Sequence, residues 1–281
     1  VLYDTPYLLG DPERESRDDA FEIDWQTGRA RVNHDVMAMT MFIPTEAEGQ
    51  RQPFAPLLFM HGHGSNSAEI LGYGGLVLQH GNALVTLNAP GHGLELSPVI
   101  LAAVRAAFSG RCLQGAANSI TLGRARDLDG DMSPDSGANY WTAYLFHTRD
   151  SVRQTIIDEI QAIRMLRGFD GRNARPRTLT TRDGNAFAFD GDYNRDGRPD
   201  IAGDFDGNGT PDLGGPNSPY AAAGGSLGGI VTGLLAGAEP ALTSSVPVVG
   251  GGGLADIAIR TEHGAVLAAL MLRVLGPLVV S

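Results

Sequence analysis

The feature that most constrains the fold is a pair of short apolar runs, each of which stops abruptly at a glycine-rich turn. The first run covers 56–60 and ends at His-Gly-His-Gly over 61–64, and the second covers 83–88 and ends at Ala-Pro-Gly-His-Gly over 89–93. Apolar runs of this length, bounded by turn residues, are typical of strands buried on both faces of a parallel sheet. Because the residues between them (67–80) are predicted to be helical, the segment is expected to form a βαβ unit.

Further strands and helices are predicted along the rest of the chain. The strands are expected at 37–43, 220–223 and 245–249, and the helices at 97–108, 149–167 and 230–238. In the helix at 149–167, Val152, Ile156, Ile160 and Ile163 share one apolar stripe. Asp158 and Glu159 are expected on the other side. The fold class predicted is α/β, a mostly parallel sheet flanked by helices.

The predicted organisation is one domain with two insertions. Residues 1–36 are polar with little periodicity and are expected to form an extended lead-in to a domain over 37–281. The segment 97–147 leaves the carboxyl edge of the sheet and is a possible cap over a pocket. Its apolar helix at 97–108 is either core or an acyl-binding wall. The segment 168–218 is rich in Gly, Asp and Asn and forms the second insertion.

Composition excludes several function classes. The 281 residues carry a net charge of −11, which argues against nucleic acid and anionic membrane surfaces as main partners. No apolar run reaches the roughly 20 residues of a membrane span, so no transmembrane segment is expected.

The sequence Gly224-Gly225-Ser226-Leu227-Gly228 matches G-x-S-x-G, and it lies between a predicted strand and a predicted helix. Glycines two residues before and after the serine allow a turn too tight for side chains. Such a turn lifts the Ser226 hydroxyl above the sheet edge at the start of a helix. There the backbone N–H of Leu227 can donate to a developing oxyanion. The alternative is a glycine-rich structural turn in which the serine has no catalytic role.

These motifs together resemble the α/β-hydrolase family, which pairs an H-G-x-G loop with G-x-S-x-G. The segment 88–93 (Asn-Ala-Pro-Gly-His-Gly) is similar to a further family loop, D-x-x-G-H-G, and the three motifs occur in the family's order over about 37–250. The resemblance implies that Ser226 is the nucleophile and that the backbone N–H groups of His63 and Leu227 form the oxyanion hole. The side chains of His61, His63 and His92 are expected to brace loops through hydrogen bonds.

The resemblance does not supply an acid and a base. In the family both follow the nucleophile, on loops after two later strands. Only 55 residues follow Ser226 here, and the candidates Asp256, Glu262 and His263 come soon after the strand at 245–249. Two explanations stay open: the chain is a fragment whose acid and histidine lie on a second polypeptide, or catalysis has been lost. The first residue, Val1, and the apolar end at 276–281 favour the fragment.

Two acidic loops repeat twelve residues apart between 190 and 212. At positions 1, 3, 5 and 9 the first loop carries Asp192, Asn194, Asp196 and Asp200, and the second Asp204, Asp206, Asn208 and Asp212, each with a glycine at position 6. The carbonyls of Arg198 and Thr210, at position 7, are further expected ligands. Alternating oxygen side chains around a sharp turn suit a cation with six to eight ligands. The loops resemble the D-x-[DN]-x-[DN]-G-x-x-D calcium loops of dockerins and thrombospondin-type repeats.

The expected cofactor is therefore calcium, two ions with a structural role. Topology places the tandem loops on the face opposite Ser226, because sites in open α/β sheets lie beyond the carboxyl ends of the strands. A solvated Asp/Gly turn region is the alternative. A third segment repeats the spacing with Asp127, Asp129, Asp131 and Asp135, but Met132 replaces the turn glycine, so its metal binding stays open.

The sequence predicts a serine ester hydrolase of the esterase or lipase type, stabilised by calcium and acting on hydrophobic esters. The alternative is a non-catalytic hydrolase-like module of a calcium-dependent surface or extracellular assembly. Loops of modest affinity need millimolar calcium, which predicts a secreted, periplasmic or cell-surface location.

Overall fold

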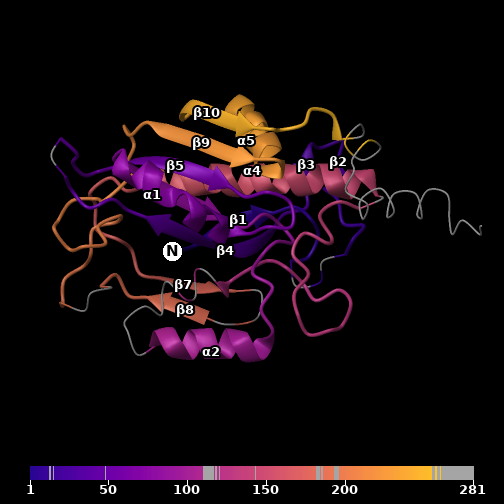
Figure 1. Cartoon of the computed structure of the whole chain (residues 1–281), viewed down its shortest axis with the longest axis horizontal. Coiled ribbons are helices and arrows are strands. Elements are labelled where there is room, and N and C mark those ends of the chain that lie inside the picture. The colour runs from indigo at the N-terminus through magenta and orange to yellow at the C-terminus, as the bar shows by residue number, and fades with distance from the viewer. Residues whose placement is uncertain are drawn as a thin grey trace, which may run out of the picture.

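The five predicted strands and one unpredicted strand, β1, form a six-stranded sheet with the order β1-β4-β6-β5-β9-β10 (Figure 1). In this computed structural model, β6, β5, β9 and β10 run parallel and β4 is antiparallel to both of its neighbours. The fold class is thus α/β with a mostly parallel sheet, as predicted. The strands are β1 (Leu2–Tyr7), β4 (Asn33–Phe42), β5 (Ala55–Met60), β6 (Asn82–Leu87), β9 (Tyr220–Gly225) and β10 (Leu242–Val248).

The structure describes most of the chain. The described residues are 1–109 without 13, 15 and 48, then 117, 119, 121–142, 144–181, 184, 186–192, 196–254, 257 and 260. Among these residues, no helix combines the length and apolar character needed to cross a bilayer.

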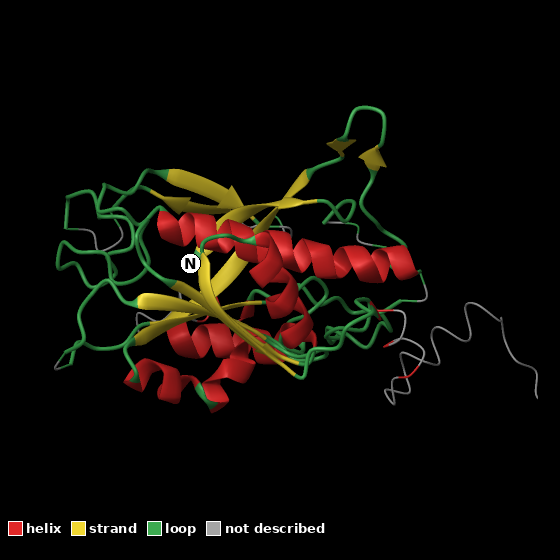
Figure 2. Ribbon diagram, turned by 90° about the horizontal axis from the view of Figure 1, so that it is seen from above, coloured by secondary structure: helices red, strands yellow, loops and turns green. Residues whose placement is uncertain are grey.

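Helices cover both faces of the sheet (Figure 2). On one face α4 (Leu145–Arg167) and α5 (Leu227–Ala238) pack together against β1, β5 and β9. On the other face a 3₁₀ helix, η1 (Ser67–Gly72), and α1 (Gly74–Gln79) pack against β6. Successive strand residues point to opposite faces, so Leu58 and Met60 join the α4–α5 core while Phe59 joins the core under α1. β5 is therefore buried on both faces, as its unbroken apolar run predicts.

The expected lead-in over 1–36 is wrong in one respect, because residues 2–7 are a strand of the main sheet. β1 pairs antiparallel with β4, which begins at Asn33 and not at residue 37. Tyr3, Thr5 and Tyr7 alternate as buried residues along β1. Asp4 and Pro6 between them hide this alternation in a hydropathy profile. The strands β2 (Ile23–Asp24) and β3 (Arg29–Ala30) of this segment form a short hairpin outside the main sheet.

The two insertions also differ from expectation. The segment 168–218 contains an unpredicted hairpin of β7 (Arg177–Thr180) and β8 (Ala186–Phe189). The apolar helix α2 (Pro98–Ser109) is largely exposed, with Val99 79% and Ile100 51% accessible. In Figure 1, α2 lies at the opposite side of the molecule from β9 and α5. Since Ser226 lies between β9 and α5, α2 is neither core nor a wall beside this serine.

Asp158 was expected on the solvent side of its helix, but it is fully buried. Thr5 Oγ1 and Gln154 Nε2 donate to Asp158 Oδ1 at 3.0 and 2.8 Å. Arg124 forms ion pairs with Asp158 at 2.6 Å and with Asp35 at 3.1 Å. Because Asp35 is on β4 and Asp158 on α4, one arginine joins sheet, helix and the loop that contains residue 124. Such charges are buried only where they are paired.

Glu159 is also buried, only 2% exposed, and among the described residues its Oε2 atom has no hydrogen-bond partner. Burial, and next the charge of Asp158, raise the pKa of Glu159 from 4.5 to about 8. Between pH 4.5 and 8, Glu159 is therefore protonated in the folded protein and ionised in the unfolded chain. The free energy of unfolding is expected to fall as pH rises from 4.5 to 8, by about 1.4 kcal/mol per pH unit from this group.

Glu159→Gln is expected to remove this dependence, because an amide does not ionise. The variant is expected to match the wild type in chemical denaturation near pH 5 and to exceed it by a few kcal/mol near pH 8. Glu22→Gln is the matched control, since the Glu22 side chain is 65% exposed and pairs with Arg31 at the surface. Equal gains for both variants, or none for Glu159→Gln at pH 8, would contradict the buried-acid assignment.

Candidate active site

Ser226 connects β9 to α5 and has a strained backbone. Its φ of 55° and ψ of −114° lie outside the regions that non-glycine residues favour, and its side chain is exposed. Strain of this kind costs on the order of 1–3 kcal/mol and is kept where the surrounding structure imposes it. Here the Ser226 N–H donates to Val248 O at 3.0 Å, which ties the turn to the end of β10.

The two flanking glycines are required by close backbone contacts. A Cβ on Gly224 would lie 2.6 Å from the Gly228 backbone and 2.8 Å from Met60 O. A Cβ on Gly228 would overlap Met60 O. The strand-turn-helix therefore packs directly against the end of β5. This is the physical reason for glycine at both positions of the G-x-S-x-G motif.

Leu227 is the first residue of α5, and it is buried at the base of the turn. The first N–H groups of a helix have no intrahelical acceptor and lie at the positive end of the helix dipole. The Leu227 N–H is thus placed where the sequence predicts an oxyanion donor, directly after Ser226.

The His-Gly-His-Gly loop lies against the same turn. β5 and β9 are neighbours with Met60 opposite Gly224, so the loop at 61–64 and Ser226 leave the same edge of the sheet. A methyl group placed on Gly62 would lie 4.0 Å from Ser226 Cβ. The structure therefore brings Ser226, Leu227 and the loop that contains His63 together.

His61 and His92 brace the two loops, as expected. His61 Nε2 accepts the Ala89 N–H at 3.1 Å, so its Nδ1–H donates to Gly62 O at 2.8 Å. His92 Nδ1 donates to Pro90 O at 2.9 Å. Burial lowers the pKa of both histidines, that of His92 well below its ordinary value, so both rings are neutral at pH 7.

His63 packs in a cluster of aromatic rings with His92 and Trp141. Its ring lies 5.5 Å from that of His92 and 6.0 Å from that of Trp141. The segment at 136–141 holds this group in place, because the Gly137 N–H donates to Gly91 O at 2.8 Å and Ser136 Oγ donates to Ser65 O at 2.9 Å.

The candidates for the acid and the base, Asp256, Glu262 and His263, lie outside the described residues. Both ring nitrogens of His61 are used in loop contacts, so His61 does not serve Ser226 as a base. Sequence reasoning missed Glu69, whose carboxylate accepts the Gly62 N–H at 3.0 Å. A signal for it was available: Glu69 is the one acidic residue between 61 and 94.

The second predicted metal loop brings its carboxylates together. Oxygen atoms of Asp204, Asp206 and Asp212 lie within 4.8 Å of one another. Gly209 has a φ of +87°, and its N–H donates to Asp204 Oδ2 at 2.8 Å. The Asn208 side chain instead turns back, because Oδ1 accepts the Thr210 N–H at 2.8 Å. This donor set of three carboxylates fits a hard cation such as calcium.

This loop lies at the amino-terminal edge of the sheet, as predicted. The Phe54 N–H donates to Asp212 O at 2.8 Å, and the Gly214 N–H donates to Phe54 O at 3.0 Å. Phe54 directly precedes β5, whereas Ser226 lies beyond the carboxyl end of the neighbouring β9. A six-residue strand separates the two edges by roughly 20 Å.

The first loop is described in part, and Asn194 lies outside the described residues. Asp192 Oδ2 accepts the Gly197 N–H at 2.9 Å, as Asp204 does from Gly209. The Arg198 N–H donates to Asp196 Oδ1 at 2.8 Å, and Asp200 closes the segment through its N–H to Gly191 O at 2.7 Å.

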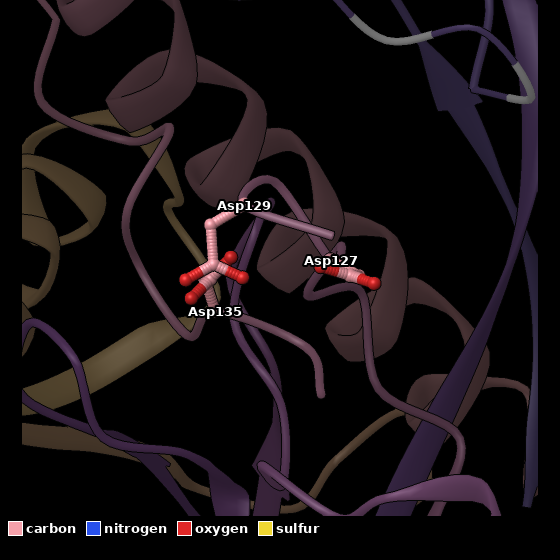
Figure 3. Close-up of side chains that lie close together, drawn as sticks. All are labelled: Asp127, Asp129 and Asp135. Atoms are coloured by element: carbon pink, nitrogen blue, oxygen red, sulfur yellow. The ribbon is translucent and has the colours of Figure 1, made fainter. Parts of the chain in front are cut away.

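The third acidic segment has the same turn. Asp127, Asp129 and Asp135 have oxygen atoms within 4.8 Å of one another; in Figure 3 the carboxylates of Asp129 and Asp135 overlap in the view, and that of Asp127 lies beside them. Met132 takes the left-handed conformation of the turn glycine, with a φ of +72°, and its N–H donates to Asp127 Oδ2 at 2.9 Å. Asp131 is outside this group and accepts the Ser133 N–H at 2.7 Å. Met132 therefore does not prevent the loop conformation.

Comparisons with known proteins give no family. No family model matches the sequence, and no curated protein matches it. Similar solved structures include one described as "Lipase (Open form)", with 12% identity and a TM-score of 0.35 over 87% of this chain and 43% of the other. Another is an acetyl xylan esterase from Paenibacillus sp. R4, with 15% identity and a TM-score of 0.41 over 87% of this chain and 57% of the other. The chain thus spans about half the length of these structures.

Proposed function

We propose that this protein is a serine ester hydrolase of the esterase or lipase type, which forms an acyl-enzyme on Ser226. The observation that carries the proposal is the strained, exposed Ser226 at the start of α5, with the loop that contains Gly62 packed against it. Strained residues cluster at active sites, and this strain therefore supports a functional role for Ser226. The hydroxyl would lose its proton to a base, attack the ester carbonyl and expel the alcohol, which leaves the acyl group on Ser226; water would then release the carboxylic acid and restore the hydroxyl. The N–H groups of His63 and Leu227 would stabilise the oxyanion formed in each step.

A serine hydroxyl needs a general base, and we propose that the acid and histidine come from a segment next to β10. β10 is an edge strand, and its residues from Thr243 to Val248 are exposed. Val246 and Val248 are 55% and 49% accessible. Exposed apolar edge strands tend to pair with a further strand. A strand added here, from this protein or from a second polypeptide, would continue the sheet beyond the nucleophile.

Hydrolysis of p-nitrophenyl esters by the native protein tests the proposed activity. Acyl chains of two to twelve carbons measure the expected preference for hydrophobic esters, and a peptide map of the same material shows whether a second polypeptide carries an acid and a histidine. Turnover that a fluorophosphonate blocks supports the proposal. Absence of turnover with every ester, in material that contains all polypeptides, favours the non-catalytic module instead.

We also propose that the acidic loops at 192–200 and 204–212 each bind a structural calcium ion. Support comes from three converging carboxylates in the second loop and the matching turn in the first. Without a cation, the seven aspartates over 190–212 repel one another, because only two arginines in the segment offset their charge. The bound ion would let this insertion fold against Phe54. Loops of this kind work at millimolar calcium, so we propose a location outside the cytoplasm.

Removal of calcium is expected to destabilise the protein. Chelation with EGTA is expected to lower the Tm by about 5 °C or more, and excess calcium to restore it. Asp212→Asn is expected to weaken this calcium response. Asp170→Asn is the matched control, because Asp170 lies outside the two loops and forms an ion pair with the exposed Arg172. A Tm that is the same with and without chelator would contradict structural calcium.

A further inference from the structure

The peptide groups on both sides of Gly62 are held by hydrogen bonds. On one side, the Gly62 N–H donates to Glu69 Oε2 at 3.0 Å. On the other, Gly62 O accepts from His61 Nδ1 at 2.8 Å and from the Ser65 N–H at 3.2 Å. In a trans peptide the carbonyl and the N–H point in opposite directions. Fixing the Gly62 carbonyl therefore also fixes the direction of the His63 N–H.

Glu69 is itself held firmly. Tyr73 donates its hydroxyl to Glu69 Oε1 at 3.1 Å, and Ser65 donates a further side-chain hydrogen bond. Burial alone would raise the pKa of Glu69, but the hydrogen bonds from Gly62, Ser65 and Tyr73 outweigh it and lower that pKa. Glu69 is thus an ionised acceptor at neutral pH, and hydrogen bonds to ionised acceptors are about twice as strong as neutral ones.

Glu69 and Ser226 both lie next to Gly62. A methyl group placed on Gly62 would lie 3.8 Å from Glu69 Oε2 and 4.0 Å from Ser226 Cβ. The carboxylate is therefore close enough to Ser226 to control the backbone beside it. Both of its oxygens already accept hydrogen bonds, from Gly62 and Tyr73, so its position suits holding this backbone and not removing a proton from Ser226.

We infer that Glu69 is a positioning residue for the oxyanion hole: its carboxylate clamps the Gly62 N–H and so holds the loop that presents the His63 N–H beside Ser226. This inference rests on the proposed function of Ser226. The clamp explains a charged residue in an otherwise uncharged stretch. It also assigns different roles to adjacent N–H groups: that of Gly62 donates to Glu69, and that of His63 is assigned to the oxyanion.

Two readouts test this role in the full native protein. The first is amide hydrogen exchange at Gly62, which reports on the clamp without any need for activity. The second is the phosphonylation of Ser226 by a small fluorophosphonate, separated into reversible affinity and maximal rate. Glu69→Ala removes the acceptor, whereas Glu69→Gln keeps a neutral acceptor oxygen. Glu95→Gln is the matched control, since Glu95 also accepts a backbone N–H at 3.0 Å, from Ser136.

Glu69→Ala is expected to speed Gly62 exchange and to lower the maximal phosphonylation rate by ~10- to 100-fold with unchanged reversible affinity. Glu69→Gln is expected to recover much of that rate, and Glu95→Gln to match the wild type. Unchanged Gly62 exchange in Glu69→Ala would overturn the clamp. Faster exchange with an unchanged rate would overturn its link to the oxyanion hole. A wild-type protein that does not react would overturn the proposed function instead, while the exchange result would still decide the clamp.

Discussion

Ser226→Ala is expected to abolish covalent labelling by a fluorophosphonate and to lower ester hydrolysis by at least ~10³-fold, because no other group replaces the attacking hydroxyl. Labelling is measured by intact mass, and hydrolysis with a p-nitrophenyl ester. Ser218→Ala is the matched control, since Ser218 precedes the other end of β9. It is expected to retain full labelling. Labelling of Ser226→Ala at the wild-type rate would contradict the nucleophile assignment.

The backbone strain at Ser226 can be tested separately, through the free energy of unfolding. Glycine adopts a φ of +55° at little cost, whereas serine and alanine do not. Ser226→Gly is therefore expected to raise the free energy of unfolding by about 1 kcal/mol relative to Ser226→Ala. Equal stabilities of the two variants would contradict the strained turn.

Gly228→Ala is expected to have the largest effect on folding. The added methyl group would overlap Met60 O, and both the end of β5 and the start of α5 would have to move. Overpacking against backbone leaves no side chain to rearrange, so we expect a loss of roughly 3 kcal/mol or more in the free energy of unfolding. Chemical denaturation or soluble yield measures this loss.

Gly237→Ala, in the same helix, is the control for this variant. A Cβ there meets open space, and alanine is favoured over glycine in a helix by about 1 kcal/mol. This control is therefore expected to be as stable as the wild type or more so. A tolerated Gly228→Ala would show that the turn at Ser226 is not packed against β5 as described.

The sheet and the serine turn could be predicted because their signals are local. The run at 56–60 is apolar throughout, and a parallel strand buried on both faces requires this. The turn at Ser226 has an equally local signal, the G-x-S-x-G spacing, although the backbone of Met60 that requires Gly224 and Gly228 is distant in the chain. The loop at 204–212 also closes on its own aspartates, so its spacing was visible in the sequence.

The sequence-based predictions failed for features that depend on contacts between residues distant in the chain. Asp158 is buried because Thr5, 153 residues away, and Arg124 contact it, and no pattern within its helix shows these partners. β1 was missed because residues far along the chain cover its tyrosines: Tyr3 donates its hydroxyl to Asp158 O on α4, and the Arg124 guanidinium lies over the Tyr7 ring. Glu69 lies only seven residues from Gly62, but its role depends on the way β5 ends beside Ser226.

The most direct test of Ser226 as the nucleophile is to map the fluorophosphonate adduct on the native protein. We expect one adduct per chain, on the proteolytic peptide that contains Ser226, with fragment ions that place the added mass on this residue. An adduct on any other residue, or no adduct while ester hydrolysis continues, would contradict the assignment of Ser226 as the nucleophile.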